Sequence, residues 1–332
     1  MLEVIVPAYN AGRFLRQALD SVAAQIRRPE LVTVVDDRST DNTALVALGA
    51  AAHYGDALPI RLRRNTGMRG PAAARNLALR ESRAEFVALL DADDRLRPDH
   101  HRLLLAAIGS CPDAVASFGD ATLFGPQGVT LKSRLAKSGM AKLAASEVAP
   151  GFYSPLNGMF GPLLKSGVFD TSACLLRRDA ALAAGLFDET LRHGEDTDLF
   201  LRMALKGRFV FTRETVMDKR QHDANLTDRR NAIEFCRAKV MTLMKFYAEA
   251  ETWKLSREQK DMVDAELSRA LDSYTYHASR AGAVRYGDAL QLARSARQPG
   301  IALKPRHLTR MMLVGMGFGA AVGIVDNDVS AR

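Results

Sequence analysis

The stretch FVALLDADD, residues 86–94, is an apolar run that ends in a cluster of carboxylates. The apolar residues predict a buried strand over residues 86–90. Because side chains alternate between the two faces of a strand, we expect Asp91 and Asp93 to point the same way. Two carboxylates at the point where a strand reaches water can hold a divalent cation, which prefers oxygen ligands. Taken alone, the same residues would fit an acidic turn equally well.

Strand and helix patterns alternate through the first hundred residues. We predict strands over residues 3–7, 31–35, 60–62 and 86–90, and helices over residues 11–25, 43–52 and 71–80. This alternation is typical of an α/β fold in which helices flank a mostly parallel sheet. Ligands bind such sheets beyond the carboxyl ends of the strands. Both acidic clusters, at Asp36-Asp37 and at residues 91–94, follow predicted strands and fall at that edge.

The rest of the chain divides into three parts. Residues 113–169 carry scattered Gly and Pro and predict a long irregular segment, which in compact domains is usually either a functional loop or disordered. A second ordered part follows, with a strand over residues 173–176 and helices over residues 179–184 and 196–206. From Asn231 to about Arg297 the pattern is helical. We therefore predict an α/β domain over residues 1–228 and a helical C-terminal region over residues 229–332.

Composition narrows the class of protein. With 47% hydrophobic and 25% charged residues, the chain resembles a soluble globular protein. The three cysteines, Cys111, Cys174 and Cys236, lack paired spacing, which argues against a disulfide scaffold or zinc site and fits a reducing compartment. The first residues show no signal-peptide pattern, so we expect a cytoplasmic location.

The net charge of +8 is concentrated near the C-terminus, where residues 277–310 hold seven Lys or Arg and a single acid. Such a region can meet nucleic acid, anionic lipid or solvent. No nucleic-acid motif accompanies it, so we expect no nucleic-acid partner.

Further polar segments lie at predicted element ends. After the first strand, the ring of Tyr9 could stack on a base, and the carboxylates of Asp36 and Asp37 could accept a hydrogen bond from one. Helix capping accounts for residues 39–41 but not for that pair. Residues 65–76 form a glycine-bearing loop that leads into a helix, a weak signal for an anion site.

Three acids and a histidine follow later in the chain. The acids in residues 195–198 either complement the dipole of the helix they begin or include a catalytic carboxylate, two equally balanced interpretations. Residues 220–222, which include His222, are assigned to a polar linker, where a lone histidine is more often structural or solvated than a ligand.

Together and in this order, the segments resemble family 2 glycosyltransferases with the GT-A fold, the Rossmann-like fold of nucleotide-diphospho-sugar transferases. The resemblance covers roughly the first 225 residues. It is carried by VIVPAYN (4–10), VVDDRSTD (34–41), NTG (65–67), ARN (74–76), LDADD (90–94), GLFDE (185–189), GED (194–196) and RQH (220–222). One departure is Arg38, which stands where the family usually has a small residue.

The resemblance implies an inverting transfer from a nucleotide-diphosphate sugar, with a UDP-sugar as first choice, and a divalent cation, Mn²⁺ or Mg²⁺. The acceptor would be a glycan or lipid-linked glycan in cell-surface polysaccharide synthesis. By position, the resemblance implies that Asp196 is the general base. It also implies that Asp93 and His222 hold the metal, and that His222 can contact the diphosphate. The nucleotide and donor would be bound by Pro7, Tyr9, Asp36, Asp37, Arg75 and Asp91.

Two alternatives remain. The first is a sugar-phosphate nucleotidyltransferase, which normally has a glycine-rich basic loop after the first strand. This chain has PAYNAGR (7–13) there, which contains too few glycines. The second alternative is a catalytically silent subunit of a polysaccharide assembly complex that only binds a nucleotide sugar. The presence of both Asp93 and Asp196 counts against it.

Residues 311–325 are uncharged and largely apolar, but fall short of the ~20 residues that span a bilayer. They predict a core-packing helix, an oligomer contact or a membrane-surface element. Between an oligomer contact and a membrane-surface element, the nearby cations Lys304, Arg306 and Arg310 favour the membrane surface, because anionic lipid attracts such clusters. We therefore also expect a peripheral contact with the inner face of the plasma membrane.

Overall fold

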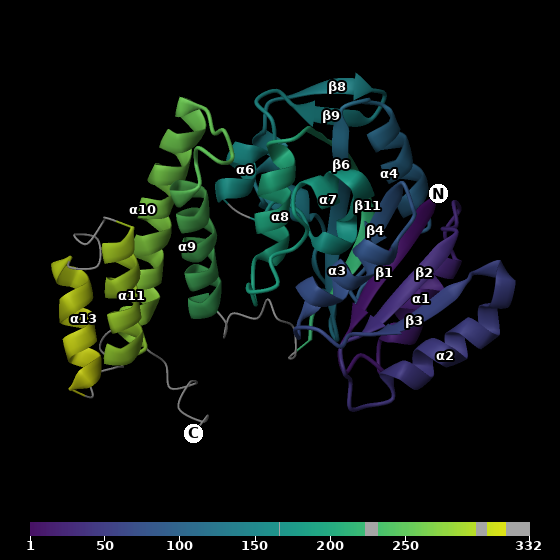
Figure 1. Cartoon of the computed structure of the whole chain (residues 1–332), viewed down its shortest axis with the longest axis horizontal. Coiled ribbons are helices and arrows are strands. Elements are labelled where there is room, and N and C mark those ends of the chain that lie inside the picture. Colours follow the sequence, from purple (N-terminus) through teal and green to yellow (C-terminus); the bar gives the residue numbers. More distant parts are fainter. Residues whose placement is uncertain (166, 223–231, 297–303, 317–332) are drawn as a thin grey trace. The chain divides into compact units, whose positions relative to one another are not determined.

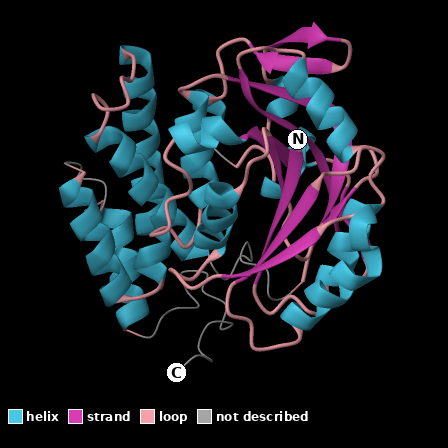
Figure 2. Ribbon diagram, turned by 45° about the vertical axis from the view of Figure 1, so that its right-hand side comes forward, coloured by secondary structure: helices cyan, strands magenta, loops and turns pink. Residues whose placement is uncertain are grey.

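The computed structural model of the chain describes residues 1–165, 167–222, 232–296 and 304–316 (Figure 1). The chain divides into two compact units, Met1–Asn225 and Leu226–Arg332. The first unit is a sheet with helices on both faces, and the second is helical (Figures 1 and 2). These features confirm the predicted α/β fold with a helical C-terminal region.

The first unit contains strands and α-helices in alternation, together with three short 3₁₀ helices. The strands are β1 (Leu2–Ala8), β2 (Leu31–Asp36), β3 (Ile60–Arg64), β4 (Phe86–Leu89), β5 (Arg95–Leu96), β6 (Ala114–Gly125), β7 (Gly128–Leu131), β8 (Ala145–Ala149), β9 (Phe152–Pro155), β10 (Cys174–Arg177) and β11 (Arg208–Arg220). The α-helices are α1 (Leu15–Ala23), α2 (Thr43–Tyr54), α3 (Pro71–Glu81), α4 (His100–Gly109), α5 (Arg134–Lys137), α6 (Phe160–Lys165), α7 (Arg178–Ala183) and α8 (Glu195–Ala204). The 3₁₀ helices are η1 (Gly55–Ala57), η2 (Met140–Lys142) and η3 (Thr171–Ala173).

All these strands form one mixed sheet in the order β3-β2-β1-β4-β10-β6-β11-β9-β8, with β5 paired to β11 and β7 to β6. Strands β3, β2, β1 and β4 are mutually parallel. Strand β10 runs antiparallel between β4 and β6, and β6 is parallel to β11. The carboxyl ends of β1, β2 and β4 therefore open on one edge of the sheet.

The central strands are apolar because both of their faces are covered. Along β1, Val4 and Val6 belong to the core cluster that includes Leu15 and Leu19 of α1, whereas Ile5 is equally buried but lies outside that cluster. Alternating side chains thus enter opposite layers. The central strands are therefore packed on both faces of the sheet.

The expectation of a long irregular segment over residues 113–169 is wrong. This segment contains β6, which lies inside the sheet and pairs with both β10 and β11. Its Gly119 looks like a strand breaker, yet a Cβ there would lie 2.6 Å from the Val216 side chain of β11. Glycine is needed at this position because the two strands approach closely.

In the residues that the structure describes, the second unit contains α9 (Ala232–Ala248), α10 (Arg257–Arg280), α11 (Ala283–Ser295) and α13 (Pro305–Gly315). Helix α10 begins with a capping box formed by Ser256 and Gln259, which satisfies two backbone N–H groups at its start. Within the described residues, no helix combines the length and apolar character needed to cross a bilayer. Of the apolar stretch 311–325, residues 311–315 lie in α13 and residues 317–325 lie outside the described residues.

Candidate functional site

At the carboxyl end of β2, Asp37 holds the following glycine-bearing loop. One carboxylate oxygen accepts a hydrogen bond from the Asn65 side chain at 2.6 Å, and the other accepts one from the Gly70 backbone N–H at 2.8 Å. The neighbouring Asp36 accepts from the backbone N–H of Ser39 at 3.1 Å. Asp37 therefore ties the loop that precedes α3 to the edge of the sheet.

Arg38 adopts a left-handed backbone conformation, with φ of 64°. A bulky residue is uncommon there, because its Cβ crowds the following carbonyl group. In this chain the Arg38 guanidinium donates to the Gly67 carbonyl at 3.0 Å, which adds a second tie to the same loop.

Tyr9 and Pro7 lie at the carboxyl end of β1. The Tyr9 side chain is 54% exposed, and the guanidinium of Arg69 lies 5.6 Å from its ring centre. Pro7 stands opposite Val35 in the pairing of β1 with β2. An exposed aromatic ring next to a buried strand end is suited to stacking on a flat ligand.

The acidic turn, residues 91–94, follows β4 but is not part of it. Strand β4 ends at Leu89, and the Asp94 N–H donates to the Asp91 carbonyl at 3.0 Å, which closes a turn. Strand alternation was therefore the wrong reason for relating Asp91 to Asp93. Their carboxylates instead take different partners: Asp91 accepts from Arg75 at 2.7 Å, and Asp93 lies 2.9 Å from Nε2 of His222.

The third acid of the turn, Asp94, is 2% exposed and was not singled out from the sequence. Its carboxylate accepts from the Ser172 hydroxyl at 2.8 Å and from the Arg220 backbone N–H at 3.0 Å. Burial raises the pKa of Asp94 well above its usual value, and the charge of Asp93 adds to this, against the opposing charge of Lys219. Asp94 therefore connects the acidic turn to η3 and to the end of β11.

His222 reaches the acidic turn because β11 extends to Arg220, two residues before it. Of residues 220–222, which were assigned to a polar linker, Arg220 instead ends the strand, and Gln221 and His222 follow it. The Arg220 guanidinium donates to the Asp93 carbonyl at 2.9 Å, and the His222 ring lies 4.8 Å from that of Phe14. Burial and the charge of Asp91 raise the pKa of Asp93, while His222 opposes the rise. A strand that had not been predicted thus brings together two residues 129 positions apart in the sequence.

Arg75 on α3 joins the acidic turn to the first turn of α8. Its buried guanidinium donates to Asp91 and, at 2.9 Å, to Glu195. Burial would lower the pKa of Arg75, but the two carboxylates raise it, so the residue stays cationic. Burial and the neighbouring Asp196 raise the pKa of Glu195 to about 7, although Arg75 opposes this. Sequence reasoning did not assign Glu195 a role.

Asp196 differs from the two other acids of α8. Glu195 is bonded to Arg75, and Asp198 is buried against Arg202. Among the described residues, the contacts of the Asp196 carboxylate are with neutral donors, the Thr171 hydroxyl at 3.1 Å and the Thr197 N–H at 2.6 Å. Asp196 is only partly buried. Of the three, it is the carboxylate best placed to take up a proton from a bound molecule.

Two consecutive residues of η3 link these groups. The Thr171 hydroxyl donates to Asp196, while the Ser172 hydroxyl accepts from the Asp91 N–H at 3.0 Å and donates to Asp94. The Ser172 carbonyl in turn lies 3.1 Å from Nε2 of His100, a buried histidine of α4. The predicted base and the acidic turn therefore share one short, buried support.

Within the described residues, no group of three or more His, Cys, Asp or Glu side chains is arranged to hold a metal by itself. Asp93 and His222 nevertheless form a pair of oxygen and nitrogen donors at the sheet edge. Mg²⁺-type sites usually use one or two protein carboxylates and complete their shell with water and substrate phosphates. The Asp93 carboxylate fits a cation of that kind, provided that a phosphate-bearing ligand supplies further oxygens, and His222 offers an imidazole nitrogen beside it.

Replacing Ser172 by alanine is expected to lower the free energy of unfolding by about 1–3 kcal/mol, because the part-buried Asp91 N–H loses its acceptor and the buried Asp94 carboxylate loses one of its two donors. Urea denaturation measures this. Ser117→Ala is a matched control, since Ser117 is equally buried but its hydroxyl donates to the Leu104 carbonyl, which lies within helix α4. Equal losses in the two variants would contradict the supporting role of Ser172.

Comparison with known proteins adds independent findings. The sequence model of the family described as "Glycosyl transferase family 2" matches residues 3–179, which excludes Asp196 and His222. The succinoglycan biosynthesis protein ExoU of Rhizobium meliloti is 34% identical over 207 residues, 61% of this chain and 57% of that protein. The chain spans less than two thirds of the length of the first curated relatives it matches.

Solved structures share the fold at low sequence identity. The crystal structure of residues 1–349 of TarS from S. aureus, in complex with UDP-GlcNAc, matches with a TM-score of 0.56 at 18% identity, covering 95% of this chain and 92% of that one. A mannosyltransferase of Pyrobaculum calidifontis, in complex with GDP-Man and Mn²⁺, matches with a TM-score of 0.57 at 20% identity, covering 97% and 86%.

Proposed function

Because the chain belongs to glycosyl transferase family 2 and has the GT-A fold, we propose that it moves a sugar from a nucleotide-diphosphate donor to an acceptor hydroxyl, with inversion at the anomeric carbon. The observation that carries the proposal is the shared support at η3, where Thr171 holds Asp196 and Ser172 holds the acidic turn. A base and a donor-side acidic turn at one edge of the sheet are what such a transfer needs.

The nucleotide would bind at the ends of β1 and β2. Tyr9 offers an exposed ring for the base, with Pro7 beside it, and Asp36 and Asp37 offer carboxylates to the nucleoside. The relatives support a sugar nucleotide in general, since the TarS complex contains UDP-GlcNAc and the mannosyltransferase complex contains GDP-Man. A UDP-sugar is our first choice of donor.

The donor's ribose or sugar would meet Asp91, whose carboxylate is oriented by Arg75. Asp93 and His222 would hold a divalent cation, Mn²⁺ or Mg²⁺, together with the donor diphosphate. A cation bound there supplies Lewis-acid stabilisation of the negative charge on the departing diphosphate.

Asp196 would act as the general base. The acceptor oxygen attacks the anomeric carbon as the bond from that carbon to the diphosphate oxygen breaks, and the diphosphate leaves with the electron pair. Asp196 takes the proton that the acceptor hydroxyl loses. A single displacement, with no covalent sugar–enzyme intermediate, inverts the anomeric centre.

For the acceptor we propose a glycan or lipid-linked glycan in cell-surface polysaccharide synthesis. The relative ExoU is named for succinoglycan biosynthesis, which supports this class. A cytoplasmic location and a peripheral membrane contact stay predictions. Two of the three cations expected at the membrane, Lys304 and Arg306, are bonded to Asp272 in the structure, which reduces the charge available to lipid.

A thermal-shift panel of UDP, GDP, dTDP and CMP, each with Mn²⁺ or Mg²⁺, tests the donor site. A nucleotide at 100 times its Kd should stabilise the fold by about 2.7 kcal/mol. Hydrolysis or transfer of the matching sugar nucleotide then separates an enzyme from a silent binding subunit. Binding without turnover of any sugar nucleotide, with acceptor extracts present, would reject the catalytic proposal.

A further inference from the structure

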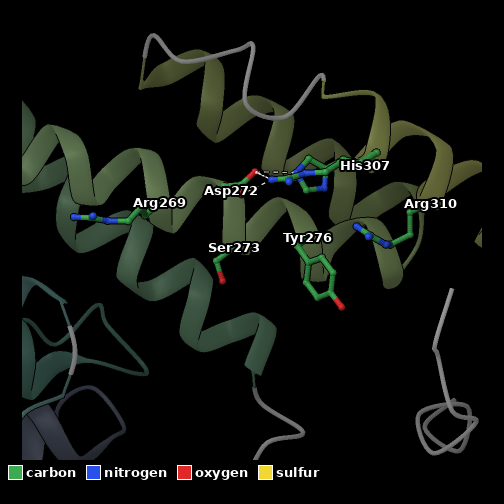
Figure 3. A pocket seen from close by; sticks show the side chains of 7 residues that line it. Arg269, Asp272, Ser273, Tyr276, His307 and Arg310 are labelled. Atoms are coloured by element: carbon green, nitrogen blue, oxygen red, sulfur yellow. Dashed lines mark hydrogen bonds and ion pairs between the residues drawn. The ribbon is translucent and has the colours of Figure 1, made fainter. Parts of the chain in front are cut away.

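The helical unit contains a hollow of about 360 Å³ between α10 and α13 (Figure 3). The residues that line it all carry polar or charged groups, three of them arginines, and none takes part in the proposed sugar transfer. The lining side chains include Asp272, Ser273 and Tyr276 from α10, and Arg306, His307 and Arg310 from α13.

The one carboxylate among these residues, Asp272, is already neutralised. It accepts hydrogen bonds from Lys304 at 2.8 Å, from Arg306 at 2.7 Å and from Nε2 of His307 at 3.0 Å. Burial would raise the pKa of Asp272, but these donors hold it well below its ordinary value. Because two full cations meet one carboxylate, Lys304 and Arg306 leave a net positive charge at the hollow.

Arg310 adds a second positive charge. Its guanidinium lies 4.5 Å from the ring centre of Tyr276, so the aromatic ring holds it in place beside the hollow. Among the described residues, no carboxylate forms an ion pair with Arg310, and its buried Nη1 atom has no hydrogen-bond partner. Buried donors are almost always satisfied, so an unpaired guanidinium nitrogen on a residue that lines the hollow points to a missing acceptor.

His307 provides a second unpartnered group. The residue is 1% exposed, and while Nε2 bonds to Asp272, no described residue contacts its buried Nδ1 with a hydrogen bond. Leaving a buried polar atom without a partner costs about 1–3 kcal/mol. Nδ1 can accept from a protonated ligand oxygen or, in the imidazolium form, donate to an ionised one.

We propose that this hollow binds a phosphate-bearing anion. The Arg310 guanidinium offers donors in the fork geometry that matches phosphate oxygens, and His307 and the Ser273 hydroxyl complete the polar wall. The phosphate could come from solution or from the headgroup of an anionic lipid. The inference concerns the helical unit alone and goes beyond the proposed sugar transfer.

Isothermal titration of the full chain with inorganic phosphate, without sugar nucleotide, tests the site. Arg310→Gln should weaken binding roughly tenfold or more, the usual effect of losing a hydrogen bond to a charged group. Arg285→Gln is the matched control, because Arg285 lies in the same unit but pairs with Glu234 at 2.7 Å. It should leave phosphate binding unchanged.

A second variant separates electrostatics from packing. Asp272→Asn removes the one negative charge at the hollow and should tighten phosphate binding, an outcome that a purely structural role of Asp272 would not produce. If Arg310→Gln does not fold, as judged by its thermal melt, Ser273→Ala replaces it and should also weaken binding.

Vesicle cosedimentation identifies the source of the phosphate. The site is assigned to a lipid headgroup if the full chain binds phosphatidic acid vesicles but not phosphatidylcholine vesicles. This binding should be lost in Arg310→Gln and kept in Arg285→Gln. Binding of free phosphate without vesicle binding assigns it to a soluble ligand. The proposal is overturned if the full chain binds neither, or if Arg310→Gln and Arg285→Gln behave alike.

Discussion

Asp196→Asn is expected to reduce sugar transfer by roughly 10²–10⁴-fold, the usual contribution of general-base catalysis, while nucleotide-sugar binding is retained. Asparagine preserves the shape of the side chain and can still accept from the Thr171 hydroxyl, so the support at η3 stays intact. It cannot take up the acceptor proton. The measurement is single-turnover transfer at saturating donor, together with the donor Kd by titration calorimetry.

The size of the effect distinguishes this role from a helix-dipole role. An acid in the first turn of a helix contributes about 0.3–1 kcal/mol to stability and nothing directly to turnover. Asp196→Glu keeps a base at a shifted position and should recover part of the lost rate. If Asp196→Asn unfolds at lower urea but turns over normally, the carboxylate only complements α8.

Glu195 requires its own comparison, because its pKa of about 7 would also suit a base at neutral pH. Its Oε1 atom is, however, bonded to Arg75 and the side chain is buried. Glu195→Gln is therefore expected to weaken donor binding through Arg75 rather than to remove the base. A larger fall in turnover for Glu195→Gln than for Asp196→Asn would move the base assignment to Glu195.

The parts of the fold that could be predicted from sequence are those with local signals. Strands β1, β2 and β4 are short apolar runs covered on both faces, and α3 begins with Pro71 at its first turn. The spacing of these elements was enough to place Asp36, Asp37 and the acidic turn at the carboxyl ends of strands, although Asp36 itself proves to be the last residue of β2. Their individual roles toward a donor stay predictions.

The parts that could not be predicted depend on pairing between distant segments. Strand β11 reads RFVFTRETVMDKR, in which charged residues interrupt the apolar ones, and its pairing with β6 has three register shifts. It is a strand because β6 offers a partner over most of its length. The burial of Asp94 and the contact between Asp93 and His222 follow from that pairing, so no local sequence pattern predicts them.

Asp93→Asn is expected to remove the strengthening of nucleotide binding by Mn²⁺ and to reduce transfer by roughly 10–100-fold or more. Even changes to residues behind a metal ligand typically cost 10–100-fold in metal affinity, and loss of a carboxylate ligand should cost no less. Since coupling between metal and nucleotide is reciprocal, titrating nucleotide with and without Mn²⁺ measures it independently of activity.

Two further variants make the test of Asp93 specific. Asp218→Asn is the matched control: its side chain is 23% exposed against 28% for Asp93, and it too bonds a cationic side chain, Arg97. It should leave the coupling between Mn²⁺ and nucleotide unchanged. His222→Asn should weaken the coupling, and the double variant with Asp93→Asn should lose little more, because two ligands of one cation act as a unit. Two outcomes would mean that Asp93 and His222 form only a structural contact. In the first, the losses of Mn²⁺–nucleotide coupling in the two single variants simply add in the double variant. In the second, Asp93→Asn keeps the full coupling and normal stability in urea.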